Sequence, residues 1–282
     1  MENANTDRFM GVGYAGRVLE QPVRYTSSDE DSARWEGFSF RPGDIVISTR
    51  SNGGTTWMQM ICALLIFQTP ELPAPLGKLS PWLDWLITPR QQVVLARLEA
   101  RTHRRFIKTH MPLDGIPLDP RAAYIVVGRH PLDLAVSLYH QSNNINRDRV
   151  RKLTASTGPE PRRPQPGLHH WLANLNGEMR RLAGLLGIGV PEELWPSLVR
   201  AATFDEMRAR AAAQAADPAG VLKDRAAFFR GGYSGAGREV LNSAELSRYY
   251  ARTARLAPPD LLDRLHRESI ASLDRVEPAE AG

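Results

Sequence analysis

Two glycines followed by two threonines are the first residues of this 282-residue chain whose types and spacing suit a chemical role. Gly53, Gly54, Thr55 and Thr56 precede an apolar run that begins at Trp57. In a turn of this kind, backbone N–H groups and the positive end of a helix dipole converge and bind anions. A Walker A loop would carry a lysine directly after its second glycine. The turn therefore favours phosphate binding over nucleotide triphosphate hydrolysis, with an ordinary helix start as the alternative.

A cation and an imidazole stand two residues apart in the segment Lys108-Thr-His-Met-Pro112. With an unperturbed pKa of about 6.5, a histidine can take a proton from an attacking hydroxyl at neutral pH. His110 lies in a predicted loop rather than on an apolar face, which favours a catalytic base. A structural or solvated histidine is the alternative. Lys108 can balance anionic charge beside it.

A third segment pairs an arginine with a hydroxyl. Arg129 follows a predicted strand, and Ser137 lies about two turns inside the helix that comes next. A guanidinium fork and a hydroxyl together suit phosphate oxygens. The alternatives are a salt bridge from Arg129 to Asp133 and a small residue, Ser137, at a helix contact. The glycine-rich segment 228–238 adds two arginines that can close over an anion or form a surface turn.

Buried strands position these groups. The runs 44–49, 105–108 and 124–127 are short and apolar, and helices over 57–67 and 132–140 follow two of them, the first capped by Thr55 or Thr56. Strands that alternate with helices predict a parallel sheet with helices on both faces, which binds ligands at the carboxyl ends of its strands. No clear fourth strand is found, and the rest of the chain predicts helices over 171–186, 192–202, 204–213, 243–255 and 259–273.

Composition limits the protein class. The chain is 42% hydrophobic and 24% charged with a net charge of +5, which predicts a folded protein of one domain, residues 1–282, suited to an anionic ligand. Residues 147–167, basic and proline-rich, predict a mobile loop. The lone cysteine, Cys62, predicts a buried thiol. No run reaches the roughly 18 to 20 apolar residues of a membrane span, so we expect a cytoplasmic protein. Aromatic residues are not interleaved with the arginine runs, which argues against nucleic-acid binding.

Taken together, the segments resemble the signature motifs of the cytosolic sulfotransferase family, in the same order, from about residue 40 to about residue 250. The matching segments are Gly54-Thr-Thr-Trp57, Lys108-Thr-His-Met-Pro112, Arg129-His-Pro-Leu-Asp-Leu-Ala-Val-Ser-Leu-Tyr-His140, Thr203-Phe-Asp-Glu-Met207 and Phe229-Arg-Gly-Gly232. The resemblance implies an α/β, P-loop-like three-layer fold with a helical C-terminal half. It also implies transfer of a sulfuryl group from 3′-phosphoadenosine-5′-phosphosulfate to a hydroxyl or amine of a small acceptor, without a metal.

The family resemblance also implies a role for each motif residue. The turn would hold the 5′-phosphosulfate, Trp57 would stack on adenine, and His110 would be the general base with Lys108 beside the transferring group. Arg129 and Ser137 would hold the 3′-phosphate. Further nucleotide contacts would come from Thr203, Phe204, Arg230, Gly231 and Gly232.

The chain departs from the family pattern at three places. Asn52 replaces a lysine that stabilises the leaving oxygen, and loss of such a contact costs on the order of 10² to 10³ in rate. A strand expected before Asn176 is missing around 168–176, and the family's short dimer motif is absent after Gly237, so no oligomeric state is assigned. The hypotheses are an active enzyme and a weakened relative that binds the nucleotide without efficient turnover; a nucleotide kinase is disfavoured.

The acceptor is expected to be a small, apolar molecule. Trp82, Leu83, Trp85 and Leu86 lie in one apolar stretch that can form a wall of its pocket. Core packing is the alternative use of that stretch.

Overall fold

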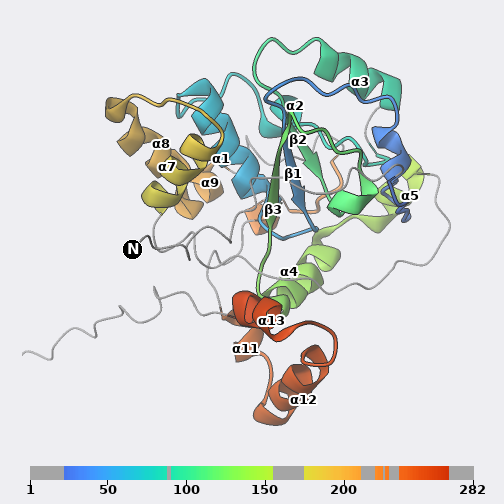
Figure 1. The fold of residues 1–282 in the computed structure, drawn as a ribbon. Coiled ribbons are helices and arrows are strands. Elements are labelled where there is room, and N and C mark those ends of the chain that lie inside the picture. The colour runs from blue at the N-terminus through green and yellow to red at the C-terminus, as the bar shows by residue number, and fades with distance from the viewer. Residues whose placement is uncertain are drawn as a thin grey trace, which may run out of the picture.

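The computed structural model describes residues 22–87, 90–154, 175–210, 220–224, 226–228 and 235–266. Within them, one parallel sheet contains strands β1 (Ile45–Thr49), β2 (Phe106–Thr109) and β3 (Ala123–Val127) in the order β2-β1-β3. The register sets Ile45 opposite Phe106 on one side and Ala123 on the other. All three predicted strands are confirmed, and Figure 1 shows the sheet in the middle of the molecule, with helices around it.

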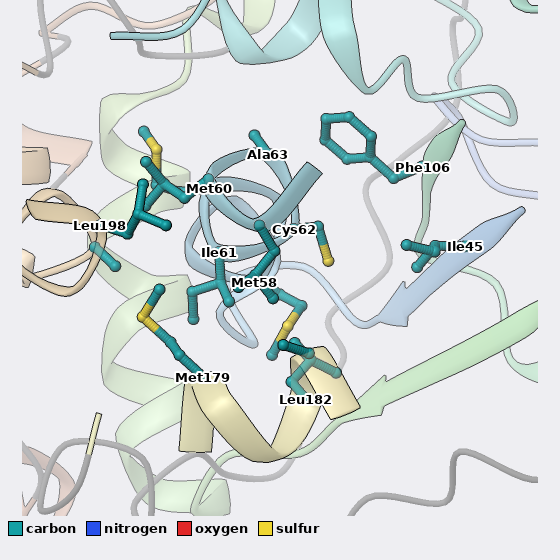
Figure 2. Close-up of a cluster of buried hydrophobic side chains, with 14 of the residues drawn as sticks. Ile45, Met58, Met60, Ile61, Cys62, Ala63, Phe106, Met179, Leu182 and Leu198 are labelled. Atoms are coloured by element: carbon teal, nitrogen blue, oxygen red, sulfur yellow. The ribbon is translucent and has the colours of Figure 1, made fainter. Parts of the chain in front are cut away.

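One face of the sheet packs against the apolar helix α1 (Thr55–Phe67). Ile45 and Phe106 face this helix from the strands, while α7 (Leu175–Leu185) and α8 (Trp195–Ala201) cover its other side (Figure 2). Because α1 is buried between the sheet and these helices, its sequence is apolar nearly all round. Cys62 lies in this core with no exposed surface, and burial raises the pKa of its thiol to about 12, so it is a packing residue.

The opposite face of the sheet has its own core. Val46, Ile107 and Tyr124 alternate with the α1-facing residues and pack against the 3-10 helix η1 (Ser32–Trp35) and helix α3 (Gln91–Glu99). The sheet is thereby sandwiched, and the predicted three-layer α/β architecture is confirmed. The remaining described elements are α2 (Leu76–Leu79), η2 (Leu113–Gly115), α4 (Pro131–Asn144), α5 (Arg147–Thr154), η3 (Glu192–Leu194), α9 (Phe204–Ala209), η4 (Ala226–Phe228), α11 (Ala236–Glu239), α12 (Ser243–Thr253) and α13 (Pro259–His266).

Two local predictions need correction. The loop expected from residue 147 begins as helix α5, because Val150 is buried against Trp85 and Val221, and its remainder lies outside the described residues. The N-cap of α1 is Gly54, with a left-handed φ of 99°, rather than a threonine. The other predicted helices are present as α4, α7, η3 with α8, α9, α12 and α13. Helix α4 is longer than predicted, and the others have shorter bounds in their described parts.

The sequence analysis found a family strand to be missing around residues 168–176. Most of this region lies outside the described residues, which do not include 155–174. Within the described ranges the sheet has only the three predicted strands. Among the described helices, none is both long and apolar enough to cross a membrane.

Candidate active site

The turn after β1 needs both of its glycines. A Cβ atom on Gly53 would lie 2.9 Å from the carbonyl oxygen of Arg50, and that carbonyl already accepts a hydrogen bond from the Gly53 N–H. Gly54 has a φ of 99°, which side chains rarely tolerate. This conformation brings the first N–H groups of α1 around the carboxyl end of β1. The predicted glycine turn is therefore present between β1 and α1, with Thr55 and Thr56 as the first residues of the helix.

Asn52 joins this turn to α4. It has a φ of 62°, a conformation that asparagine tolerates better than most residues. Its side-chain amide donates to the carbonyl oxygen of Ser137 at 3.2 Å, and its own carbonyl accepts from the Arg129 guanidinium at 3.4 Å. The two residues expected at the 3′-phosphate thus lie against the turn expected at the 5′-phosphosulfate.

His110 lies at the ends of β1 and β2 and is only 4% exposed. Its Nδ1 is 2.5 Å from the carbonyl oxygen of Thr49. A carbonyl can only accept, so Nδ1 carries the proton and Nε2 keeps a lone pair for a substrate proton. Arg50 donates to the His110 carbonyl at 3.0 Å, and Ser48 donates to the carbonyl of Met111 at 2.8 Å. Strand β1 thereby fixes the imidazole through its last residues.

The electrostatics keep this imidazole neutral. Burial lowers the pKa of His110 well below 6.5, and the positive charges of Lys108 and Arg50 lower it further, against the opposing effect of the Thr49 carbonyl. At neutral pH His110 is therefore a proton acceptor. This is the protonation state that a general base requires.

Lys108 lies beside His110 in a group of ionisable side chains. Burial lowers the pKa of Lys108 to about 8, and the charges of Glu30 and Asp84 act in the opposite direction. Burial raises the pKa of Asp84 to about 6 and that of Glu30 to about 7. The Lys108 ammonium lies 4.0 Å from the ring centroid of Trp82, whose ring also meets the His110 ring edge-on at 4.5 Å.

The residues expected around adenine also come together. The indole N–H of Trp57 donates to the carbonyl of Ala202 at 2.7 Å, directly before Thr203 and Phe204. Thr203 caps α9 by accepting from the Glu206 N–H. The structure thus places the three expected adenine contacts at one point, although they are far apart in the sequence.

Asp133 connects α4 to the C-terminal glycine segment. The sequence analysis considered this residue only as a salt-bridge partner of Arg129. The carboxylate of Asp133 accepts from the N–H groups of Gly235 at 3.1 Å and Gly237 at 2.8 Å. A Cβ on Gly237 would lie 2.3 Å from Leu132, so only glycine fits there. Arg230, Gly231 and Gly232, predicted in the same segment, lie outside the described residues.

The apolar stretch next to His110 divides between a cluster beside the imidazole and the core. The rings of Trp82 and Trp85 stack with centroids 4.7 Å apart and form a small apolar cluster with Ile145, Val150 and Val221. Leu83 points away into the second core with no exposed surface. The apolar cluster beside the imidazole therefore contains two of the four residues expected at an acceptor wall.

The sequence analysis missed three residues of the candidate site: Glu30, Arg50 and Asp84. Arg50 could have been found as a charged residue directly after a buried strand, and Asp84 as a carboxylate between two tryptophans. Glu30 carried no such signal, because only the fold brings it to Trp85 through an isolated bridge. Among the described residues, no group of His, Cys, Asp and Glu could hold a metal ion.

The sulfotransferase domain family matches residues 42–161. The glycolipid sulfotransferase of Mycobacterium tuberculosis is 38% identical in an alignment that covers 86% of this chain and 94% of that protein. Rat sulfotransferase 1A1 is 27% identical over 61% of this chain and 69% of its own length.

Solved structures show the same fold. Retinol dehydratase, in complex with androsterone and the inactive cofactor PAP, superposes with a TM-score of 0.60 at 20% identity, over 81% of this chain and 86% of that chain. Mouse sulfotransferase SULT7A1, complexed with PAP, gives a TM-score of 0.59 at 18% identity, over 83% and 91% of the two chains. With the fold, the ordered motifs and relatives along almost its whole length, the chain belongs to the sulfotransferase family.

Proposed function

We propose that this sulfotransferase uses 3′-phosphoadenosine-5′-phosphosulfate to sulfate a hydroxyl of an apolar, lipid-like acceptor, with His110 as the general base. The observation that carries the proposal is the convergence of the Gly53–Gly54 turn, the neutral His110 imidazole and Arg129 at the carboxyl ends of β1, β2 and β3. Open α/β sheets bind their ligands at this edge.

The described residues fit the nucleotide. The N–H groups of the Gly53–Thr56 turn suit the 5′-phosphosulfate, and the two glycines allow the tight backbone conformation of this turn. Arg129 and Ser137 suit the 3′-phosphate, and Trp57, Thr203 and Phe204 suit the adenine. Arg230, Gly231 and Gly232 complete the set in this proposal, and Asp133 holds Gly235 and Gly237, which follow them in the sequence, against α4.

When bound, the cosubstrate supplies an activated sulfuryl group on a good leaving phosphate. His110 accepts the acceptor's hydroxyl proton at Nε2 as the acceptor oxygen bonds to sulfur and the bond from sulfur to the phosphate oxygen breaks. The proton on Nδ1 stays with the Thr49 carbonyl, which holds the ring in this tautomer. Lys108 and the N–H groups of the turn stabilise the negative charge that builds up during transfer.

The acceptor class follows from the surroundings of His110. Trp82 and Trp85 present stacked rings beside the imidazole, backed by an aliphatic cluster. Such a wall suits an apolar body that presents a single hydroxyl. The relatives named glycolipid sulfotransferase are consistent with an acceptor that joins a sugar hydroxyl to a lipid.

A weakened enzyme is the second candidate, and Asn52 is the observation that favours it. Its amide is uncharged and donates to the Ser137 carbonyl. The cation that the family places at the leaving oxygen is therefore missing from this position. In this case the chain would bind nucleotide but turn over slowly.

Two measurements separate these candidates. Calorimetric titration with adenosine 3′,5′-bisphosphate tests nucleotide binding, and a labelled-sulfate transfer assay tests turnover on glycolipids, long-chain alcohols, phenols and amines. The proposal expects binding, with transfer to glycolipid or long-chain hydroxyls above transfer to small polar acceptors. Binding without transfer to any acceptor would support the weakened enzyme, and absence of both would refute the nucleotide site.

A further inference from the structure

An open pocket of about 500 Å³ lies at the amino-terminal ends of β1 and β2, the end of the sheet opposite His110. Two short segments line it: Arg41–Asp44 leads into β1, and Arg101–Arg105 leads into β2. Parallel strands bring both segments to the same edge. Four of the nine lining residues are arginines and a fifth is His103, so positive charge dominates the pocket.

Part of this charge is neutralised within the protein. Arg105 and Asp44, both about 2% exposed, form a two-pronged pair with distances of 2.8 and 2.5 Å. Arg41 pairs with Glu99 at 2.7 Å. These two pairs leave Arg101 and Arg104 as the remaining guanidinium charges of the pocket.

Arg101 and Arg104 bind carbonyl oxygens only. Arg104 donates to the carbonyls of Gly43 and Leu186, each at 2.5 Å, and Arg101 donates to the carbonyl of Lys78. Neither forms an ion pair with a carboxylate of the described residues. The carbonyl bonds hold both guanidinium groups in place but leave their charges unpaired.

Two buried nitrogens of the lining also lack a partner in the described part of the chain: Nε of Arg101 and Nε2 of His103. Both atoms are shielded from solvent and lie behind the surface of the pocket. The groups that the pocket offers to a ligand are therefore the guanidinium groups of Arg101 and Arg104.

We infer that this pocket binds a small organic phosphate through its phosphate group, at a site separate from the one that contains His110. Fixed guanidinium groups are the usual partners of phosphate oxygens. The volume exceeds that of a phosphate alone and lies within the range of small-molecule sites. The inference uses no residue of the sulfuryl-transfer site and stands whether or not transfer is found.

Phosphate binding can be measured by calorimetry, with inorganic phosphate and glycerol 3-phosphate as the probes. The full chain is titrated at low ionic strength without added nucleotide, because adenosine 3′,5′-bisphosphate carries phosphate groups that can occupy this pocket as well. The variants are Arg101→Gln and Arg104→Gln, and the control is Arg97→Gln. Arg97 is exposed on α3, does not line the pocket, and loses the same charge. Circular dichroism confirms that each variant is folded.

Loss of one charge-assisted contact is expected to weaken binding about tenfold or more in Arg101→Gln and Arg104→Gln, with Arg97→Gln close to the parent. The catalytic-end turn is identical in all four proteins, so a difference between Arg101→Gln and Arg97→Gln reports on the pocket alone. Equal binding in all four proteins, or none in the parent, would overturn the inference.

A second arm asks whether the phosphate is free or part of a lipid. Vesicles of phosphatidylcholine with and without phosphatidic acid are pelleted with the parent, Arg101→Gln and Arg97→Gln. Once calorimetry has shown that phosphate binding depends on the pocket, loss of pelleting with phosphatidic acid in Arg101→Gln but not in Arg97→Gln assigns the site to a lipid headgroup. Equal pelleting of the two variants assigns the site to a soluble phosphate.

Discussion

The carboxylate of Asp84 accepts a hydrogen bond from the hydroxyl of Thr109 at 2.5 Å, and both side chains have no exposed surface. The same hydroxyl accepts from the N–H of Met111 at 3.0 Å. This pair of bonds spans the turn that carries His110. Asp84 therefore supports the position of the imidazole and places a negative charge near Lys108.

Replacement of Asp84 by Asn should lower the alkaline limit of activity. An amide oxygen can still accept from Thr109, but the charge that favours protonated Lys108 is lost, so the pKa of Lys108 should fall below about 8. The pH profile of kcat/KM reports this change. A profile identical to that of the parent would show that Asp84 does not act on Lys108.

The same substitution should stabilise the protein at pH 7. Burial raises the pKa of Asp84 from 3.8 to about 6, so the folded state loses stability relative to the unfolded state as pH rises through this window. Asp84→Asn removes that loss, with an expected gain of about 1 to 3 kcal/mol at pH 7. Urea unfolding at pH 4 and pH 7 measures it, and a variant less stable than the parent at pH 7 would contradict the assigned charge effect.

The parent enzyme should lose kcat/KM as pH rises through about 8. Burial lowers the pKa of Lys108 to about this value. In the proposed mechanism, the positive charge of Lys108 lies beside the transferring group. The pH profile of kcat/KM reports the free enzyme, and that of kcat reports the enzyme–substrate complex. Because bound anionic nucleotide favours the protonated ammonium, the alkaline limit in kcat should lie at higher pH than the limit in kcat/KM. Lys108→Arg should remove the limit, since guanidinium stays charged. The same alkaline limit in Lys108→Arg would assign it to another group.

Asn52→Lys should raise kcat by at least about tenfold, because it returns a cation to the leaving-group side of the turn. Asn52→Ala is the matched control, since it removes the amide contact to Ser137 without adding charge. Its kcat should stay within about threefold of the parent, with a stability loss of about 1 kcal/mol. A large loss of kcat in Asn52→Ala, without a gain in Asn52→Lys, would show instead that the amide acts on the leaving group.

Asp133→Ala should weaken binding of adenosine 3′,5′-bisphosphate by about tenfold or more. It removes two N–H contacts that hold the glycine segment against α4, each with a charged acceptor. Asp148→Ala serves as the control, because Asp148 is an exposed residue of α5. Calorimetry compares the two variants, and equal affinities would show that this segment takes no part in nucleotide binding.

Local sequence patterns predicted the strands and the glycine turn before α1, because short apolar runs and glycine pairs determine local backbone conformation. Residues 45–49 and 106–109 needed only their own composition to be recognised as strands. Helix α5 was missed because its stability depends on Val150 packing against Trp85 and Val221, contacts that the basic sequence does not reveal. Tertiary contacts outweigh local preference in such cases.

The same distinction applies to the site. His110 and Arg129 were predicted from motifs, whereas the link from Asn52 to Ser137 depends on a positive φ that no residue pattern specified. The Asp84–Thr109 bond joins residues 25 positions apart and became visible only in the fold. Motifs therefore predicted the candidate functional groups, and the structure shows which residues hold these groups in position.

The most direct test of the proposed site measures nucleotide affinity and sulfuryl transfer side by side in His110→Ala and Arg129→Ala. His110→Ala should bind adenosine 3′,5′-bisphosphate like the parent but lose about 10² to 10⁴ in kcat. Arg129→Ala should bind it about tenfold or more weakly, with transfer restored at saturating cosubstrate. Loss of affinity in His110→Ala with normal affinity in Arg129→Ala would contradict the assigned roles of both residues.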